Sequence, residues 1–205
     1  MPPSRGRPRR ASQELLQEAA FELFQLRGYR ATSVEQIART AGFSRATFFN
    51  FFSSKAELFW VETDALIGSL RDSLESRLGE GEPPGLREAL LDHAQTMSSS
   101  AIPWALKNYR LLEAADDLVA SGASRVLELN RLFAHYLRQR AAPGERAGEA
   151  GAEAGVDAGE AGAVVQARAA ATTALLLTAL LGWIDAGVGR GGFRERLQQA
   201  FDCDL

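Results

Sequence analysis

Apolar residues recur three and four positions apart along almost the whole chain, and this spacing constrains the fold more than any other feature. Between Ser12 and Gly28, for example, Leu16, Ala20 and Leu23 fall on one face of a helix. Alternation with a period of two, which would indicate strands, is nearly absent. The sequence therefore predicts an all-α protein of about nine helices. We expect them at residues 13–27, 33–41, 44–51, 54–78, 85–99, 103–120, 123–140, 164–187 and 193–201.

Two stretches interrupt the helical pattern. The first is Gly79–Gly85, where three glycines and two prolines mark the end of a helix. The second is residues 141–163, which hold nine alanines, six glycines and five acidic residues. Each glycine costs a helix about 1 kcal/mol relative to alanine, and this segment has little apolar surface to offset the cost. We expect a flexible acidic loop over residues 141–163, with at most a short fragment of helix.

The formal net charge of −3 conceals two parts of opposite sign. Residues 1–55 carry nine arginines and lysines and four acids, a net charge of +5, whereas the rest of the chain sums to −8. Such a split indicates that the N-terminal part meets a polyanion and the remainder does not.

The cysteine content and the apolar runs indicate a cytoplasmic protein. Cys203 is the single cysteine, which suits a reducing compartment, and no apolar core follows the basic N-terminus to form a secretory signal. The most apolar run, residues 169–184, is 16 residues long, whereas a membrane span needs about 20. We expect a buried helix there and no membrane partner.

The segment around Gly42 has the pattern of a helix-turn-helix. Two helices that cross steeply need a small residue at the crossing and a turn residue that tolerates positive φ, and Ala38 and Gly42 meet these needs. Ile37, Phe43 and Phe48 are among the apolar residues that would hold the angle. Thr32 with Glu35, and Ser54 with Glu57, have the spacing of capping boxes at the flanking helices. An αα-hairpin in a helical bundle would also want such a glycine and stays open as the alternative.

The second of these helices carries side chains suited to DNA. Arg45 can fork onto guanine and Asn50 onto adenine, and Thr47 can bond either base edges or phosphates. The amides at the starts of the helices that open at Ser33 and Ser54 are available to phosphates.

Residues 21–59 closely resemble the DNA-binding domain of the TetR family of transcriptional regulators. The shared motifs are Leu-x-x-x-Gly-Tyr, Ala-Thr-x-x-x-x-Ile-Ala-x-x-Ala-Gly, Ser-x-x-Thr-Phe-aromatic-x-aromatic-Phe and Ser-Lys-x-x-Leu. The resemblance implies phosphate contacts from Thr32, Ser33 and Lys55, and a recognition surface at Arg45, Ala46, Thr47 and Asn50. The family often has Tyr where Phe49 and Phe51 stand and Pro where Ser53 stands, so Phe49 cannot bond a phosphate and is left to pack against sugar or a thymine methyl.

The first residues add a basic arm. Arg5-Gly6-Arg7-Pro8-Arg9-Arg10 resembles the core of an AT-hook, which inserts arginines into a narrow, negative minor groove. An unstructured tail that only raises non-specific affinity is the alternative. The residues expected to contact DNA are Arg5, Arg7, Arg9, Arg10, Thr32, Ser33, Ser44, Arg45, Ala46, Thr47, Phe49, Asn50 and Lys55.

The resulting domain prediction has three parts: a disordered basic arm at 1–11, a helix-turn-helix domain at 12–57, and a larger helical domain at 58–205. By resemblance, the larger domain holds a small-molecule pocket and pairs with a second subunit through its last two long helices. Trp104, Tyr109, Phe133 and Trp183 are candidates to line the pocket, with ordinary core as the alternative. Thr173, Leu176, Leu180, Phe193, Leu197 and Phe201 are candidates for the dimer interface.

The sequence predicts no enzyme, cofactor or metal site, because His93 and His135 lack a ligand pattern and no nucleophile or acid pair stands out. The interpretation is a homodimeric, nucleoid-associated regulator, a repressor that an apolar or aromatic molecule releases from a palindromic operator. Two alternatives stay open: a constitutive architectural DNA binder, and a helical ligand-binding or enzymatic protein with a vestigial N-terminal domain.

Overall fold

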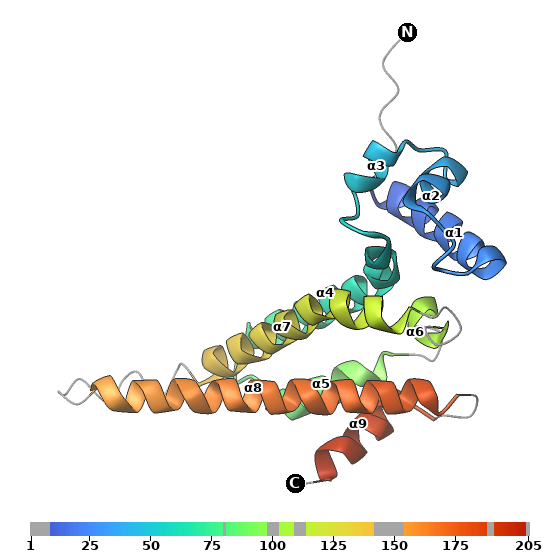
Figure 1. The fold of residues 1–205 in the computed structure, drawn as a ribbon. Helices are drawn as coiled ribbons and strands as arrows, with labels where there is room; N and C mark the ends of the chain where they lie inside the picture. The colour runs from blue at the N-terminus through green and yellow to red at the C-terminus, as the bar shows by residue number, and fades with distance from the viewer. Residues whose placement is uncertain are drawn as a thin grey trace. The chain divides into compact units, whose positions relative to one another are not determined.

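The computed structural model describes residues 9–79, 81–97, 103–108, 114–141, 154–187 and 191–203. Across these ranges the chain is helical and has no strand, which confirms the all-α prediction (Figure 1). The described helices are α1 (Arg9–Arg27), α2 (Val34–Thr40), α3 (Arg45–Phe49), the 3₁₀ helix η1 (Lys55–Trp60), α4 (Val61–Leu78), α5 (Leu86–Gln95), α6 (Trp104–Asn108), α7 (Ala115–Arg140), α8 (Ala154–Asp185) and α9 (Phe193–Asp202).

The chain forms two compact units that do not follow the expected boundary at residue 57. Unit 1 comprises Met1–Ala65 and Pro103–Ala123, and unit 2 comprises Leu66–Ile102 and Ser124–Leu205. The segment Pro103–Ala123 was expected in the larger domain. It joins unit 1 because Ala114 and Leu118 are buried in the same core as α1, α2 and α3. Helices α4 and α7 consequently each contribute residues to both units.

The core of unit 1 is an aromatic cluster between α1 and η1. The rings of Phe24, Tyr29 and Phe59 have centroids 5.1 to 5.6 Å apart. Leu16 and Ala20, from the predicted apolar face of α1, are fully buried beside them. Helix α1 begins at Arg9, within the segment expected to be a disordered arm, and Ser12 is buried inside the helix and does not open it.

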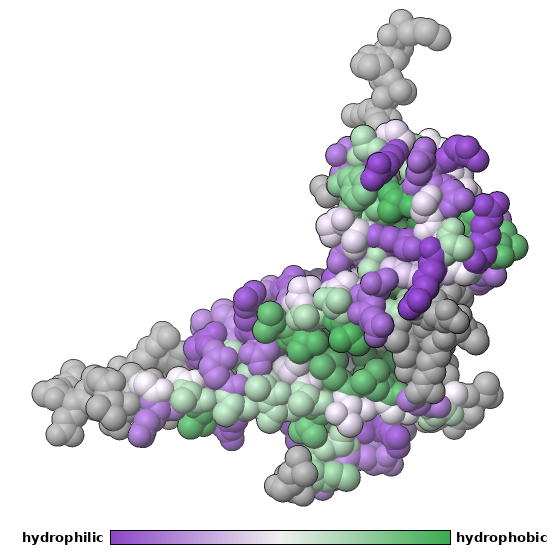
Figure 2. All heavy atoms as spheres, viewed as in Figure 1, coloured by the Kyte–Doolittle hydropathy of each residue, from purple (hydrophilic) through white to green (hydrophobic). Residues whose placement is uncertain are grey.

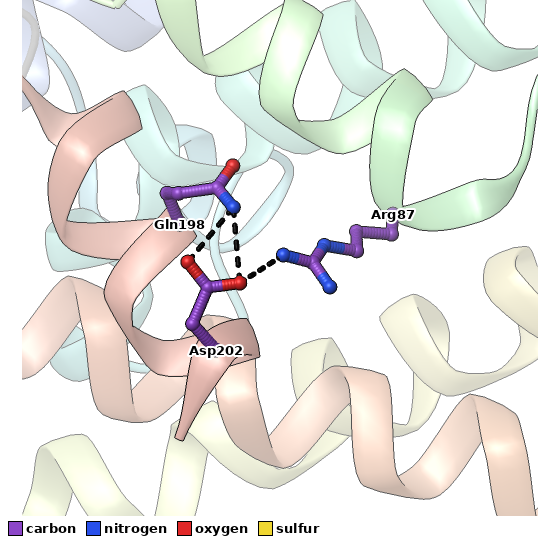
Figure 3. Close-up of polar contacts among 3 residues, drawn as sticks. All are labelled: Arg87, Gln198 and Asp202. Atoms are coloured by element: carbon purple, nitrogen blue, oxygen red, sulfur yellow. Dashed lines mark hydrogen bonds and ion pairs between the residues drawn. The ribbon is translucent and has the colours of Figure 1, made fainter. Parts of the chain in front are cut away.

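Unit 2 holds α9 against α8 and α5. Trp183 of α8 packs on Phe193 of α9 with 5.1 Å between ring centroids, and its indole N–H donates to the carbonyl of Gly191 at 3.0 Å. At the other end of α9, Arg87 of α5 pairs with the carboxylate of Asp202, which also accepts from the side-chain amide of Gln198 (Figure 3).

Three helix boundaries differ from the sequence prediction for physical reasons. The expected break near residue 122 is absent, since α7 runs continuously through Gly122. A glycine suits this position because a Cβ built there would lie 3.0 Å from the indole ring of Trp60. Helix α8 begins at Ala154, so residues 154–163 are helical, which is more helix than the short fragment expected within the loop. Extending a formed helix needs no new nucleus, which favours growth through alanine-rich sequence. Residues 142–153 lie outside the described part.

The third difference concerns the long helix expected from Ser54. Residues Lys55–Trp60 form the 3₁₀ turn η1, and Ser54 makes no side-chain capping hydrogen bond, so the capping box predicted with Glu57 is wrong. The regular helix α4 starts only at Val61. The tighter turn leaves Ala56, Leu58 and Phe59 buried in unit 1.

Candidate nucleic-acid interface

The turn between α2 and α3 has the geometry that the sequence predicts. Gly42 has φ = +77°, in the left-handed region that glycine adopts without steric cost. The N–H of Gly42 donates to the carbonyl of Arg39 at 3.1 Å, and that of Phe43 donates to the carbonyl of Ala38 at 2.7 Å. These two bonds form a Schellman motif, which ends α2 and sets the direction of α3. Ala38, the predicted small residue, is buried.

Helix α2 begins one residue later than predicted, with a different capping box. The Ser33 hydroxyl accepts from the N–H of Gln36 at 3.2 Å, and the Gln36 side chain accepts from the N–H of Ser33 at 2.8 Å. Thr32 and Glu35 were expected in these roles. Thr32 is only 2 % exposed, and its hydroxyl donates to the carbonyl of Gly28 at 2.8 Å. A phosphate contact from its side chain is therefore at odds with the structure, whereas Ser33 is exposed.

Helix α3 exposes most of the predicted recognition residues. Phe48 is the buried anchor, while Ser44, Arg45, Ala46, Phe49 and Asn50 are exposed and Thr47 is half-buried. Ser44 is the N-cap: its hydroxyl accepts from the N–H of Thr47 at 3.0 Å and is 2.8 Å from the Thr47 hydroxyl. Asn50 is the C-cap. The structure thus brings these residues together on one short, well-capped helix.

Lys55 points inward, contrary to its expected phosphate contact. Its ammonium donates to the carbonyls of Tyr29 at 2.6 Å and Thr32 at 2.9 Å, and it lies 3.9 Å from the centroid of the Tyr29 ring. Burial lowers the pKa of Lys55, and the carboxylate of Asp117 partly opposes this shift. Because two of its three N–H donors are taken, Lys55 clamps the turn that leads into α2.

Sequence reasoning missed the polar contacts that α7 makes with the rest of unit 1. The hydroxyl of Tyr29 is hydrogen-bonded to Asp117, and burial together with this carboxylate raises the pKa of Tyr29 far above its ordinary value. The indole N–H of Trp60 donates to the hydroxyl of Ser121 at 2.8 Å. No local sequence pattern predicts these pairs, because their members lie about 60 to 90 residues apart in the sequence.

The other predicted site residues have mixed positions. Arg5 and Arg7 lie outside the described residues, as do the side chains of Arg9, Arg10 and Trp104 and the whole of Tyr109; the backbone of Arg9 and Arg10 is helical. Phe133 and Trp183 are fully buried. Thr173, Phe193 and Leu197, expected at a dimer interface, are buried inside unit 2 because their stripes face the core of their own chain. Leu176, Leu180 and Phe201 are half-buried.

No group of three His, Cys, Asp or Glu side chains in the described ranges is arranged to hold a metal ion. The segment Gly159–Asp185 of α8 is long and apolar enough to cross a membrane by length and composition alone, which is weak evidence for a span. Only 17 % of its apolar 18-residue window is buried, so the buried helix expected at residues 169–184 is not found.

Comparisons with known proteins agree with this geometry. Residues 16–60 match the family model described as "Bacterial regulatory proteins, tetR family". The chain is 34 % identical over 89 residues to MftR of Mycobacterium tuberculosis, a transcriptional regulator by its name, covering 42 % of this chain and 44 % of that protein. It is 32 % identical over 139 residues to the HTH-type transcriptional regulator TcmR of Streptomyces glaucescens, covering 64 % and 61 %. The chain thus matches less than two thirds of the length of either relative.

A solved structure has the same fold over nearly the whole chain. Thermus thermophilus FadR, described as a TetR family transcriptional repressor in complex with lauroyl-CoA, superposes with a TM-score of 0.57 at 24 % identity, covering 93 % of this chain and 91 % of that one. The family model and the named relatives identify residues 16–60 as a DNA-binding domain of the tetR family of bacterial regulatory proteins.

Proposed function

We propose that this protein is a ligand-responsive, sequence-specific transcriptional regulator, a repressor that a small apolar or aromatic molecule releases from a palindromic operator. The observation that carries the proposal is the capped α2–Gly42–α3 motif, which exposes Arg45 and Asn50 from a rigid support. Side chains of these types read base edges in the major groove. The proposal places the protein in the cytoplasm, where its DNA lies.

The DNA-binding part is tested by selection from random double-stranded DNA with the full chain. We expect a palindromic consensus whose half-sites lie about one helical turn apart, roughly 34–36 Å. Arg45→Ala and Asn50→Ala should each weaken operator binding by about 1–3 kcal/mol and relax the preferred sequence. Lys107→Ala, which removes an exposed lysine of α6, is the matched control. Operator binding that both recognition variants leave unchanged would rule out this assignment of α3.

The basic arm is proposed to reach the minor groove beside each half-site. Because α1 begins at Arg9, deletion of residues 1–8 removes Arg5 and Arg7 without cutting the helix. The deletion should weaken binding and lower the slope of log affinity against log salt by about 0.9 for each lost phosphate contact. The consensus core should stay the same, and a changed core would contradict the role of the arm as an accessory contact.

The proposed dimer interface is a stripe of α8 residues that are exposed in the described structure. Only 17 % of the most apolar 18-residue window of this helix is buried. Six exposed residues follow each other at spacings of three and four, the repeat by which paired helices pack. They are Val164, Ala167, Ala171, Ala174, Thr178 and Leu181, called here the α8 stripe. The apolar surface along α8 is visible in Figure 2. Val164 is 56 % exposed and Leu181 is 53 % exposed.

Sedimentation of the purified chain tests the α8 stripe. We expect the wild-type protein to be a dimer and Ala171→Glu to shift it toward monomer with loss of operator binding, because the change puts a charge into a close helix contact. Leu127→Glu, at an exposed leucine of α7 outside the stripe, should leave the dimer intact. An Ala171→Glu protein that sediments as the wild type would refute the interface.

The effector is proposed to be apolar or aromatic. Apart from the tyrosines Tyr29 and Tyr136, the buried polar side chains among the described residues are Ser12, Gln17, Thr32 and Thr173, and none of these four carries a charge. A core of this kind favours a ligand without buried charge. The structural neighbour from Thermus thermophilus was solved with lauroyl-CoA, which carries an apolar chain. Release follows if the ligand prefers a conformation that holds DNA weakly, since a ligand with equal affinity for both conformations shifts nothing.

A thermal-shift screen with and without operator DNA tests the regulatory part. The probes are lauroyl-CoA and a panel of apolar and aromatic compounds. An effector should raise the melting temperature of the free protein, and it should lower operator affinity by the same factor by which operator lowers effector affinity. Specific DNA binding without any effector would favour the constitutive architectural alternative. If the purified protein binds no DNA at all, the alternative of a vestigial N-terminal domain is favoured.

A further inference from the structure

The exposed surface of α3 is divided between side chains that bond each other and side chains that face outward. Ser44 and Thr47 share a hydrogen bond and cap the helix. Phe48 is buried in the core of unit 1. Arg45 and Phe49 lie four positions apart, so they occupy the same face of the helix. They are the charged residue and the large aromatic residue that α3 exposes.

Arg45 and Phe49 contact each other. The guanidinium carbon of Arg45 lies 5.5 Å from the centroid of the Phe49 ring, within the range of a cation–π interaction. Phe49 is 46 % exposed, so its ring is open to an apolar partner from outside the protein. A guanidinium held over a ring keeps its N–H edge available for a planar acceptor pair and loses less freedom on binding. The free protein thus presents a pre-oriented fork beside an apolar ring.

The chemistry of this pair selects a particular base step. Guanine offers two adjacent acceptors, O6 and N7, to a forked donor in the major groove, and thymine offers the C5-methyl group as an apolar contact. Phe49 has no hydroxyl and cannot bond a phosphate. Side chains four apart on a helix are about 5–6 Å apart at Cβ, so the pair spans neighbouring base pairs rather than a single one.

We propose that Arg45 and Phe49 act as one specificity-determining unit that reads a guanine beside a thymine in each operator half-site. Arg45 bonds the guanine through O6 and N7, and Phe49 contacts the thymine methyl while it orients Arg45. This inference rests on the proposed DNA-binding function, and it adds the base step that the function requires.

The experiment uses the full chain and the consensus duplex from the random-DNA selection. The consensus half-site should contain adjacent guanine and thymine. Deoxyuridine in place of that thymine removes only the methyl group and should lower wild-type affinity about fourfold, the effect of one methyl leaving an apolar contact. In Phe49→Ala the same DNA change should lower affinity less than about twofold, because the methyl no longer has a partner. Phe49→Tyr keeps the ring and is the matched control that should retain the fourfold effect.

A second arm separates the orientation of Arg45 from the methyl contact. Replacing the guanine by 7-deazaguanine removes the N7 acceptor and should lower wild-type affinity about tenfold. Phe49→Leu keeps an apolar side chain without an aromatic face, so the deoxyuridine effect should persist while the 7-deazaguanine effect shrinks. Arg45→Lys keeps the charge without the fork and should lose the 7-deazaguanine effect with an unchanged salt slope.

The outcomes distinguish this inference from the function on which it rests. A consensus without adjacent guanine and thymine overturns the inference and leaves DNA binding intact. A deoxyuridine effect of the same size in wild-type and Phe49→Ala proteins does the same. A wild-type chain that retains no DNA overturns both. Circular dichroism of each variant should match the wild type, because both side chains are exposed.

Discussion

The inward position of Lys55 leads to a prediction that separates a structural role from a DNA contact. In Lys55→Met the two hydrogen bonds to the carbonyls of Tyr29 and Thr32 are lost, together with the contact on the Tyr29 ring. Thr32 and Tyr29 are both buried, so water does not readily replace the ammonium at those carbonyls.

The size of the effect follows from the bonds lost. A hydrogen bond with a charged partner contributes about 1.5–3 kcal/mol, and a cation–π contact adds about 0.5–1 kcal/mol. The two bonds and the ring contact together contribute about 3.5–7 kcal/mol. Methionine fills a similar volume and carries no charge to desolvate, so part of the lost free energy of unfolding is recovered. Because methionine avoids the cost of desolvating the ammonium, we expect the free energy of unfolding to fall by less than this sum, about 2–3 kcal/mol.

The assay compares stability with the salt dependence of binding. Urea unfolding of the free protein, followed by tryptophan fluorescence, measures the first, and operator titrations between low and moderate salt measure the second. If Lys55 is a structural clamp, Lys55→Met lowers the free energy of unfolding and leaves the salt dependence of operator binding unchanged. A stability loss below about 0.5 kcal/mol combined with a slope smaller by about 0.9 would refute the reasoning and restore the phosphate contact. Lys107→Met, at an exposed lysine, should change neither quantity.

Three further predictions concern the turn, the α7 contact and pH. Gly42→Ala should lower the free energy of unfolding by about 1–2 kcal/mol through backbone strain alone, since no atom lies within 4 Å of the added Cβ. Gly42→Asn should lower it less, because asparagine tolerates positive φ better, and urea unfolding measures both effects. Gly122→Ala should destabilise the otherwise wild-type protein by about 1–3 kcal/mol, because the added Cβ lies close to the indole ring of Trp60. In a Trp60→Leu background the same change should stabilise the protein by up to about 1 kcal/mol, because alanine has the higher helix propensity. Stabilisation by Gly122→Ala alone would contradict the close approach of α7 to Trp60. Burial, and to a smaller extent the charge of Arg77, lowers the pKa of His93 in the folded protein, so His93 binds a proton more readily in the unfolded chain. The free energy of unfolding should therefore fall as the pH drops below about 6.5. Unfolding curves of His93→Gln should show a smaller fall over the same pH range.

The helices and the turn of the DNA-binding motif could be predicted because they depend on local physics. Spacing of apolar residues by three and four is enough to indicate helices, and the left-handed turn at Gly42 needs a residue without Cβ. Ala38 was identified as the small residue at the crossing by the same kind of local steric argument, and it is buried there.

Capping and charge were harder to assign because neighbouring residues compete for the same roles. Thr32 and Ser33 are both good helix caps by residue type. Only the structure shows that the Thr32 hydroxyl donates to the carbonyl of Gly28, which leaves Ser33 to cap α2. From the sequence alone, Lys55 is expected to be a cation at the protein surface. Its inward position depends on the Tyr29 ring and two carbonyls that the fold brings together.

By itself the sequence determined the helical class, the helix-turn-helix and the exposed residues of α3, since each follows from spacing or from the needs of one turn. The tertiary structure alone decided what covers each apolar stripe. An amphipathic pattern states that one face is buried but not which surface buries it, so Phe193 and Leu197 could be read as dimer contacts although they pack within their own chain. For the same reason, only the structure shows that Leu118 and Ser121 of α7 lie in the unit that carries the DNA-binding motif.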